Sequence, residues 1–160
     1  MRRLEKTIRE IGWTHAVPRL GVKDAVSAAF DQMSGEAHDC VLVMDGTALA
    51  GIFTSRDFVN RIAAVRADPQ TLTLGEVMTQ MPRTLRPRDP VAFAINWMAM
   101  EGFRNVPIVD DDGEVLGVLT VWDVMRHLEA IFDDMDAAPR AALASDGSSP
   151  IEAYDLGGGS

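Results

Sequence analysis

Short apolar runs separated by polar turn residues occur in two parts of the chain and predict two β-hairpins. An Asp-Gly pair, Asp45-Gly46 in the first and Asp112-Gly113 in the second, stands between the two runs of each hairpin. Such a pair favours a tight turn, because glycine adopts the positive φ angle that hairpin turns require. The four predicted strands are residues 41–44, 49–53, 106–109 and 115–119.

Apolar residues at helical spacing flank both predicted hairpins. They predict a helix over roughly residues 22–33 before the first hairpin and one over residues 90–100 before the second. A further helix begins near Thr54 or Thr120, and another helix start is predicted within residues 74–78. The apolar faces of the two helices that follow the hairpins are formed by Val59, Ile62, Ala63 and Val65, and by Val124, Leu128 and Ile131.

The two halves of the chain are copies of one another. Residues 51–59 match residues 117–125 at an offset of 66, and the same offset aligns residues 40–43 with residues 106–109. Further upstream, Pro18 pairs with Pro87 at an offset of 69, which predicts three extra residues in the first copy, within residues 34–39. Such internal self-similarity is typical of a repeated structural unit.

Each copy has the predicted order β-α-β-β-α, and its small sheet cannot be covered on both faces by its own two helices. Two copies packed sheet to sheet solve this problem. We therefore predict an α+β fold with a first domain at residues 13–67 and a second at residues 74–131. Residues 133–160, rich in Ala, Ser, Gly and Asp, are predicted to be a disordered acidic tail.

Composition and charge exclude several classes of protein. Of the 160 residues, 47% are hydrophobic and one is a cysteine, so a disulfide-stapled secreted scaffold is excluded. A net charge of −9 repels duplex nucleic acid and anionic membranes. The first residues alternate in charge, and no apolar run has the length of a membrane helix, so we expect a cytoplasmic protein.

The motif Gly-apolar-apolar-Thr-x-x-Asp ends the hairpin of each copy, with Thr54 and Asp57 in the first and Thr120 and Asp123 in the second. One interpretation is a helix cap, in which threonine and aspartate bind backbone N–H groups. The other is a ligand site, because a helix N-terminus attracts phosphate and a carboxylate accepts hydrogen bonds from both hydroxyls of a ribose.

These paired motifs, together with the strand at residues 104–110 and the Val-Met-Thr at residues 77–79, resemble a tandem pair of CBS (cystathionine beta-synthase) domains, known as a Bateman module. The resemblance covers residues 13 to 130. It implies two β-α-β-β-α repeats related by a pseudo-twofold axis, with two clefts that bind AMP, ADP, ATP or S-adenosylmethionine. It also implies a homodimer, a regulated partner protein that the sequence does not identify, and no catalytic activity.

Carried over to this chain, the resemblance implies that Asp57 and Asp123 bind the ribose hydroxyls of the ligand. It implies that Thr54 and Thr120 bind its phosphate or its ribose. The base pocket is then lined by two pairs of neighbouring strand residues, Cys40-Val41 and Val106-Pro107.

Arginine side chains are the predicted phosphate ligands, because guanidinium binds phosphate through two parallel hydrogen bonds. Arg56 lies between Thr54 and Asp57, whereas the second copy has Trp122 at that position. In the second cleft the positive charge is then expected from Arg86, Arg88 or Arg104.

Other chemistry finds little support in the sequence. Residues 110–112 are three aspartates, but their spacing fits a solvated turn better than a calcium loop, and we predict no metal site. The three histidines fall in different elements, and no catalytic constellation is present. Two hypotheses follow: a stand-alone regulatory module that requires no cofactor and senses an adenine nucleotide, and an interaction module with empty clefts.

Overall fold

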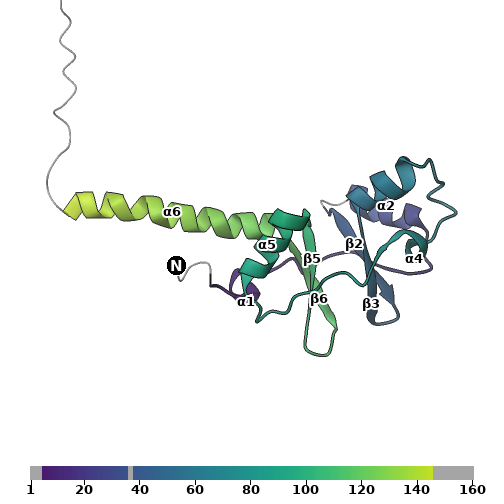
Figure 1. The fold of residues 1–160 in the computed structure, drawn as a ribbon, viewed down its shortest axis with the longest axis horizontal. Helices are drawn as coiled ribbons and strands as arrows, with labels where there is room; N and C mark the ends of the chain where they lie inside the picture. Colours follow the sequence, from purple (N-terminus) through teal and green to yellow (C-terminus); the bar gives the residue numbers. More distant parts are fainter. Residues whose placement is uncertain (1–4, 36–37, 146–160) are drawn as a thin grey trace, which may run out of the picture. The chain divides into compact units, whose positions relative to one another are not determined.

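The structure is a computed structural model that describes residues 5–35 and 38–145. Two antiparallel hairpins form where the sequence predicts them (Figure 1). The first pairs β2 (Cys40–Asp45) with β3 (Ala48–Thr54), and the second pairs β5 (Asn105–Val109) with β6 (Val115–Thr120). Each hairpin is the centre of one sheet.

The two sheets follow the same plan. In the first, β1 (Arg19–Gly21) lies parallel to β2, and β4 (Thr79–Gln80) lies antiparallel to β3. In the second, a parallel bridge from Leu85 to Ile108 and an antiparallel bridge from Thr14 to Val118 take the corresponding places beside β5 and β6. The predicted α+β fold with two repeats is confirmed.

The pairing register corrects the predicted alignment of the copies. Thr54 lies opposite Cys40 and Thr120 lies opposite Asn105, so the counterpart of Cys40 is Asn105 rather than Val106. The offset between β2 and β5 is therefore 65. It becomes 66 after the turn, because four residues separate Met44 from Leu49 whereas five separate Val109 from Val115.

The same offset of 65 holds for the helices that precede the hairpins, α2 (Val26–Gly35) and α5 (Val91–Glu101). Before each helix an aspartate closes the same turn: Asp24 Oδ2 accepts from the Gly21 N–H, and Asp89 Oδ2 accepts from the Arg86 N–H, both at 2.7 Å. The predicted offset of 69 is therefore wrong, and so are the three extra residues in the first copy. The offset of 69 rested on the Pro-Arg pair that occurs in both copies, but these two pairs are not at equivalent positions. Buried positions and turn hydrogen bonds determine the true register.

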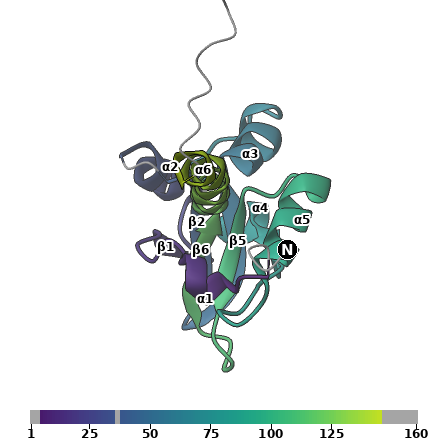
Figure 2. The ribbon, with the colours of Figure 1, turned by 90° about the vertical axis from the view of Figure 1, so that its left-hand side faces the viewer.

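The opening segments of the two copies are exchanged. The short helix α4 (Leu74–Val77) follows the first copy in sequence and packs against that copy: the Leu74 N–H donates to Asp24 O at 2.8 Å. The short helix α1 (Ile8–Ile11) binds the second copy, and the Ile8 N–H donates to Asp89 O at 3.0 Å. Figures 1 and 2 both show α1 beside β6.

Matching capping boxes begin these two short helices. In α4, the Thr73 N–H and hydroxyl donate to Glu76 Oε2 at 2.8 and 2.9 Å. In α1, Thr7 and Glu10 form the same arrangement. These hydrogen bonds favour the ionised carboxylates and hold the pKa of both glutamates below the ordinary value.

Two clusters of buried residues lie on the two faces of the first sheet. Val41 and Val43 of β2 point to the helices, whereas Cys40 and Leu42 point to the other sheet, as the alternation of a strand requires. The helix-side cluster consists of Val26, Ala29, Val41, Val43, Phe53, Ile62, Leu74 and Val77. The cluster between the sheets consists of Val17, Cys40, Leu42, Ile52, Val109, Val115 and Val118.

A helix follows each hairpin. After β3, α3 (Ser55–Asp57) continues as the π-helix η1 (Phe58–Ala63). After β6, α6 (Val121–Ser145) is α-helical throughout. The chain divides into two compact units, residues 1–125 and 126–160, and the first contains both sheets.

The helix α6 corrects the predicted disorder of the tail between residues 133 and 145. Alanine is frequent there, and alanine has the highest helix propensity of the amino acids. The remaining part of the predicted tail, residues 146–160, lies outside the described residues.

Candidate functional site

The Thr-x-x-Asp motif forms a reciprocal cap at the end of each hairpin. Asp57 Oδ2 accepts hydrogen bonds from the Thr54 N–H at 3.0 Å and the Thr54 hydroxyl at 3.1 Å, and the Asp57 N–H donates back to Thr54 Oγ1 at 3.3 Å. Asp123 and Thr120 repeat these contacts at 2.8, 2.9 and 3.2 Å. Both aspartates are buried. The capping interpretation of the motif is therefore realised in both copies.

A second threonine reaches each aspartate from the exchanged opening segments. The Thr79 hydroxyl donates to Asp57 Oδ1 at 3.4 Å, and the Thr14 hydroxyl donates to Asp123 Oδ2 at 3.2 Å. In each copy, the Thr-x-x-Asp motif forms the junction between the hairpin and the helix that follows it. The Val-Met-Thr signature of residues 77–79 thus contacts the junction of the first copy, not that of the second. Each junction combines a hairpin end from one copy with the opening segment of the other.

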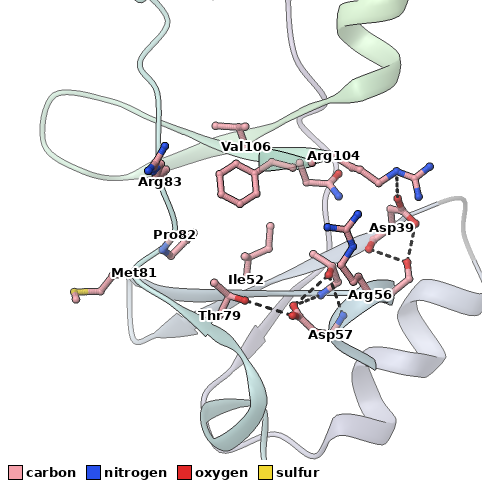
Figure 3. A pocket seen from close by; sticks show the side chains of 15 residues that line it. Asp39, Ile52, Arg56, Asp57, Thr79, Met81, Pro82, Arg83, Arg104 and Val106 are labelled. Carbon is pink, nitrogen blue, oxygen red and sulfur yellow. Dashed lines mark hydrogen bonds and ion pairs between the residues drawn. The ribbon is translucent and has the colours of Figure 1, made fainter. Parts of the chain in front are cut away.

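A cavity of about 380 Å³ opens at the Asp57 junction (Figure 3). Asp57 and the two threonines that contact it provide one polar wall. Apolar side chains from both copies provide another, with Ile52 and Val106 on facing strands (Figure 3). The full lining is Asp39, Ile52, Thr54, Ser55, Arg56, Asp57, Thr79, Met81, Pro82, Arg83, Gly102, Phe103, Arg104, Asn105 and Val106.

Three arginines of this lining bring positive charge to the cavity. The guanidinium of Arg56 lies beside Gly102, which caps α5 with a φ of +73°: a Cβ atom at Gly102 would lie 3.5 Å from Arg56 Nη1. Among the residues that the structure describes, none forms an ion pair with Arg56. Its guanidinium is thus available to an anion that enters the cavity.

The other two arginines already have acidic partners. Arg83 forms an ion pair with Glu101, and its guanidinium carbon lies 5.3 Å from the ring centre of Trp97 and 6.0 Å from that of Phe103. The Nε atom of Arg104 lies 3.9 Å from Asp39 Oδ2. These contacts place both cations at the cavity wall before any ligand enters.

Asp39 and Arg104 are counterparts in the two copies under the offset of 65. Each one's carbonyl oxygen accepts from the first residue of the helix that follows the hairpin: Ser55 N–H donates to Asp39 at 3.1 Å and Val121 N–H donates to Arg104 at 2.8 Å. Their ion pair therefore joins the copies at the pseudo-twofold axis.

The structure brings five of the ten predicted ligand residues into the Asp57 cavity. They are Thr54, Arg56, Asp57, Arg104 and Val106. Thr120 and Asp123 belong to the other junction. Among the predicted base-pocket residues outside this cavity are Cys40, Val41 and Pro107, all of which are buried.

Two of these buried residues, Val41 and Cys40, belong to the hydrophobic core on opposite faces of the first sheet. Val41 packs on the helix side of the first sheet, and Cys40 lies between the sheets. Burial, together with the nearby charge of Asp39, raises the pKa of the Cys40 thiol to about 12, so this thiol stays protonated at neutral pH.

The junction at Asp123 carries different side chains. Trp122 replaces Arg56, Pro18 stands at the position that corresponds to Arg83, and Trp122 is 59% exposed. Arg86 and Arg88, predicted as phosphate ligands of this second cleft, both form ion pairs with Asp111 instead. The third predicted ligand, Arg104, lines the first cavity.

Several lining residues were not predicted from the sequence. Thr79 lies in the Val-Met-Thr signature, but nothing in the pattern shows that this segment serves the first copy. Arg83 and Phe103 lie in polar or irregular segments without periodicity. A signal for Asp39 does exist in the sequence: it directly precedes the strand that begins at Cys40, as the predicted ligand residue Arg104 directly precedes the strand that begins at Asn105.

In the described part of the chain, no group of three or more His, Cys, Asp or Glu side chains is arranged to hold a metal ion. The three aspartates at residues 110–112 form a turn in which Asp110 Oδ1 accepts from the N–H groups of Asp112 and Glu114, both at 2.9 Å. None of the helices described is long and apolar enough to cross a membrane.

Comparison with known proteins gives the family. The family model for the CBS domain matches residues 14–64 and 74–130, so the chain belongs to the CBS domain family as a tandem pair. The "Meiotically up-regulated gene 70 protein" of Schizosaccharomyces pombe is 31% identical over 110 residues, which cover 69% of this chain and 15% of that protein. The chain thus spans a small part of that relative.

Solved structures share the fold. The CBS domain protein NE2398 is 26% identical, with a TM-score of 0.70 over 79% of this chain and 98% of that chain. The CBS domain protein PAE2072 from Pyrobaculum aerophilum, solved in complex with AMP, is 20% identical, with a TM-score of 0.66 over 74% of this chain and 89% of that chain.

Proposed function

We propose that the chain is a regulatory module that binds AMP, ADP or ATP in the cavity at Asp57 and catalyses no reaction. The observation that carries this proposal is the placement of a buried carboxylate and three guanidinium groups around one cavity of about 380 Å³. A carboxylate accepts hydrogen bonds from sugar hydroxyls, and guanidinium groups bind phosphate. A nucleotide carries both groups on one molecule.

The cavity offers each part of a nucleotide a suitable surface. Asp57 would accept from the ribose hydroxyls, and the apolar wall of Ile52 and Val106 would contact the base. Arg56, which forms no ion pair with any acidic residue that the structure describes, is the first choice for the phosphate, with Arg104 beside it. An AMP complex of the structural neighbour from Pyrobaculum aerophilum supports this choice of ligand.

The charge of the cavity favours phosphate-containing ligands over S-adenosylmethionine. Three arginines, Arg56, Arg83 and Arg104, face two carboxylates in the lining. S-adenosylmethionine carries a sulfonium cation, which these arginines would repel. The cleft at Asp123, with Trp122 in place of Arg56, is proposed to bind phosphate more weakly.

A thermal-shift screen of the full chain tests this function. The ligands are AMP, ADP, ATP, S-adenosylmethionine and adenosine, and a ligand that binds only the folded state raises Tm by mass action. We expect AMP, ADP and ATP to raise Tm. This rise should disappear in Asp57→Ala and persist in the matched variant Asp123→Ala. No rise with any ligand at millimolar concentration would contradict the proposal.

A second candidate function, an interaction module with empty clefts, is favoured by one observation. Both Thr-x-x-Asp motifs satisfy their own backbone caps without a ligand. If capping is their whole role, Asp57→Ala lowers the free energy of unfolding by about 1 kcal/mol and changes no binding. The same thermal-shift screen therefore separates the two functions.

A further inference from the structure

Arg61 of η1 contacts Asp57 from the side that faces away from the Thr54 cap. Its Nη2 atom lies 3.7 Å from Asp57 Oδ1, and its Nη1–H donates to the Val77 carbonyl oxygen at 2.7 Å. The guanidinium therefore spans two elements, the helix that carries Asp57 and the end of α4. Arg61 does not line the cavity.

The two oxygens of the Asp57 carboxylate have separate sets of partners. Oδ2 is held by Thr54, a neighbour in the same turn. Oδ1 contacts Thr79 of the exchanged segment and Arg61, which lies four residues after Asp57 in the same helix and is itself bound to Val77 of the exchanged segment. One edge of the carboxylate is thus fixed by its own helix cap, and the other by Thr79 directly and by an arginine that is anchored to the same segment.

The contact with Val77 gives Arg61 a fixed direction. Arg61 is partly exposed, with a side-chain exposure of 43%, and an isolated exposed ion pair contributes little. A hydrogen bond to the carbonyl oxygen of the buried residue Val77, at the end of α4, restricts the side chain, so that its second N–H arm stays beside Asp57 Oδ1. The segment around it, η1, has π-helical hydrogen bonds such as Ala64 N–H to Val59 O at 2.8 Å.

We infer that Arg61 is a positioning residue, which holds the Asp57 carboxylate in the orientation that accepts the ribose hydroxyls of the ligand. This inference rests on the proposed nucleotide binding at Asp57. It adds a residue outside the cavity whose effect on binding passes through Asp57. The second copy has histidine at the corresponding position, residue 127.

A ligand pair that differs only in the ribose hydroxyls distinguishes positioning from general support of the fold. AMP carries both hydroxyls, and 2′,3′-dideoxy-AMP carries neither. Their dissociation constants are measured by isothermal titration calorimetry with the full chain and with Arg61→Met, Arg61→Lys and Arg66→Met. Arg66 is exposed, lies outside the cavity lining and provides the matched loss of one positive charge.

The wild-type chain is expected to prefer AMP over the dideoxy analogue. Arg61→Met should weaken AMP binding about tenfold, because the hydrogen bonds from the ribose hydroxyls to the charged Asp57 carboxylate become poorly aligned. It should leave the dissociation constant of the dideoxy analogue unchanged. Arg61→Lys restores part of the preference, because ammonium reaches Asp57 or Val77 but not both. Arg66→Met keeps the wild-type preference.

Other results overturn the inference in distinguishable ways. Equal loss of both ligands in Arg61→Met, or no change in either, shows that Arg61 does not act through the ribose, although nucleotide binding stands. Wild-type binding of neither ligand overturns the proposed function together with this inference. If Arg61→Met does not unfold cooperatively, Arg61→Lys and Arg61→Gln supply the same ratio of dissociation constants.

Discussion

The Thr79 hydroxyl donates a hydrogen bond of 3.4 Å to the carboxylate of Asp57, which belongs to the other copy of the repeat. The equivalent bond from Thr14 to Asp123 joins residues 109 positions apart. Each junction is therefore complete only when both copies are folded together. The proposed ligand at Asp57 would therefore contact groups of both copies, and its binding would be coupled to the arrangement of the two halves.

Removing the Thr79 hydroxyl is expected to weaken ligand binding at Asp57. Thr79→Val keeps the shape of the side chain but takes one hydrogen bond from Oδ1, so AMP should bind about three- to tenfold more weakly. Calorimetric titration measures this change. Thr14→Val is the matched control, because it removes the same bond at Asp123, and an equal effect of the two variants would contradict the assignment.

Replacing Arg56 tests where the phosphate lies. Arg56→Ala is expected to weaken ATP about tenfold and to change adenosine little, because guanidinium binds phosphate through charge-assisted hydrogen bonds. Added salt should reduce the difference between wild type and variant. Arg88→Ala removes the same charge from the Asp111 ion pair and should leave ATP binding unchanged. A similar loss for adenosine and ATP would argue against phosphate at Arg56.

Glycine opens the motif in both copies for a steric reason. A Cβ atom at Gly51 would lie 2.6 Å from the Thr79 carbonyl oxygen, and one at Gly117 would come closer than 3.0 Å to the Thr14 carbonyl oxygen. The exchanged segments cross at these points. Gly51→Ala and Gly117→Ala should each lower the free energy of unfolding by about 2 kcal/mol, measured by urea denaturation.

The exposed position Ala48, at the other end of β3, provides the control for these glycines. Ala48→Val adds side-chain volume to the same strand without meeting a crossing segment. We expect a change within about 0.5 kcal/mol. Unchanged stability in the two glycine variants would show that the crossing segments adjust freely.

Exposed apolar side chains on the helices and beside them are consistent with the expected homodimer. Phe93 and Met100 of α5 are 52% and 77% exposed. Val59 of η1 is 56% exposed, and Val65, in the turn that follows η1, is 66% exposed. Burial of such side chains is the usual driving force of association. Sedimentation equilibrium is expected to give the mass of two chains, which Met100→Glu reduces, whereas a single-chain mass at all concentrations would exclude the dimer.

Much of the fold can be predicted from local sequence. The Asp-Gly turns place both hairpins, and the motif repeated at an offset of 66 shows the duplication, because turn chemistry and apolar periodicity are encoded by neighbouring residues. The strand Cys40–Asp45 is apolar along most of its length, since both of its faces are buried. Such a run is typical of a strand between two layers.

The partners of each segment could not be predicted in this way. Nothing local shows that Thr79 serves Asp57, because the exchange of α1 and α4 depends on contacts between distant segments. Periodicity likewise does not show that Arg61 reaches Val77 across the fold. The helix beyond Asp133 was missed because its apolar residues lack a sustained period, although its alanines favour helix.

The central claim is that a nucleotide binds at Asp57, and calorimetric titration of the full chain with AMP tests it most directly. The account predicts saturable binding that Asp57→Ala abolishes and that Asp123→Ala leaves in place. Binding of AMP that survives Asp57→Ala unchanged, or the absence of AMP binding to the wild-type chain, would contradict it.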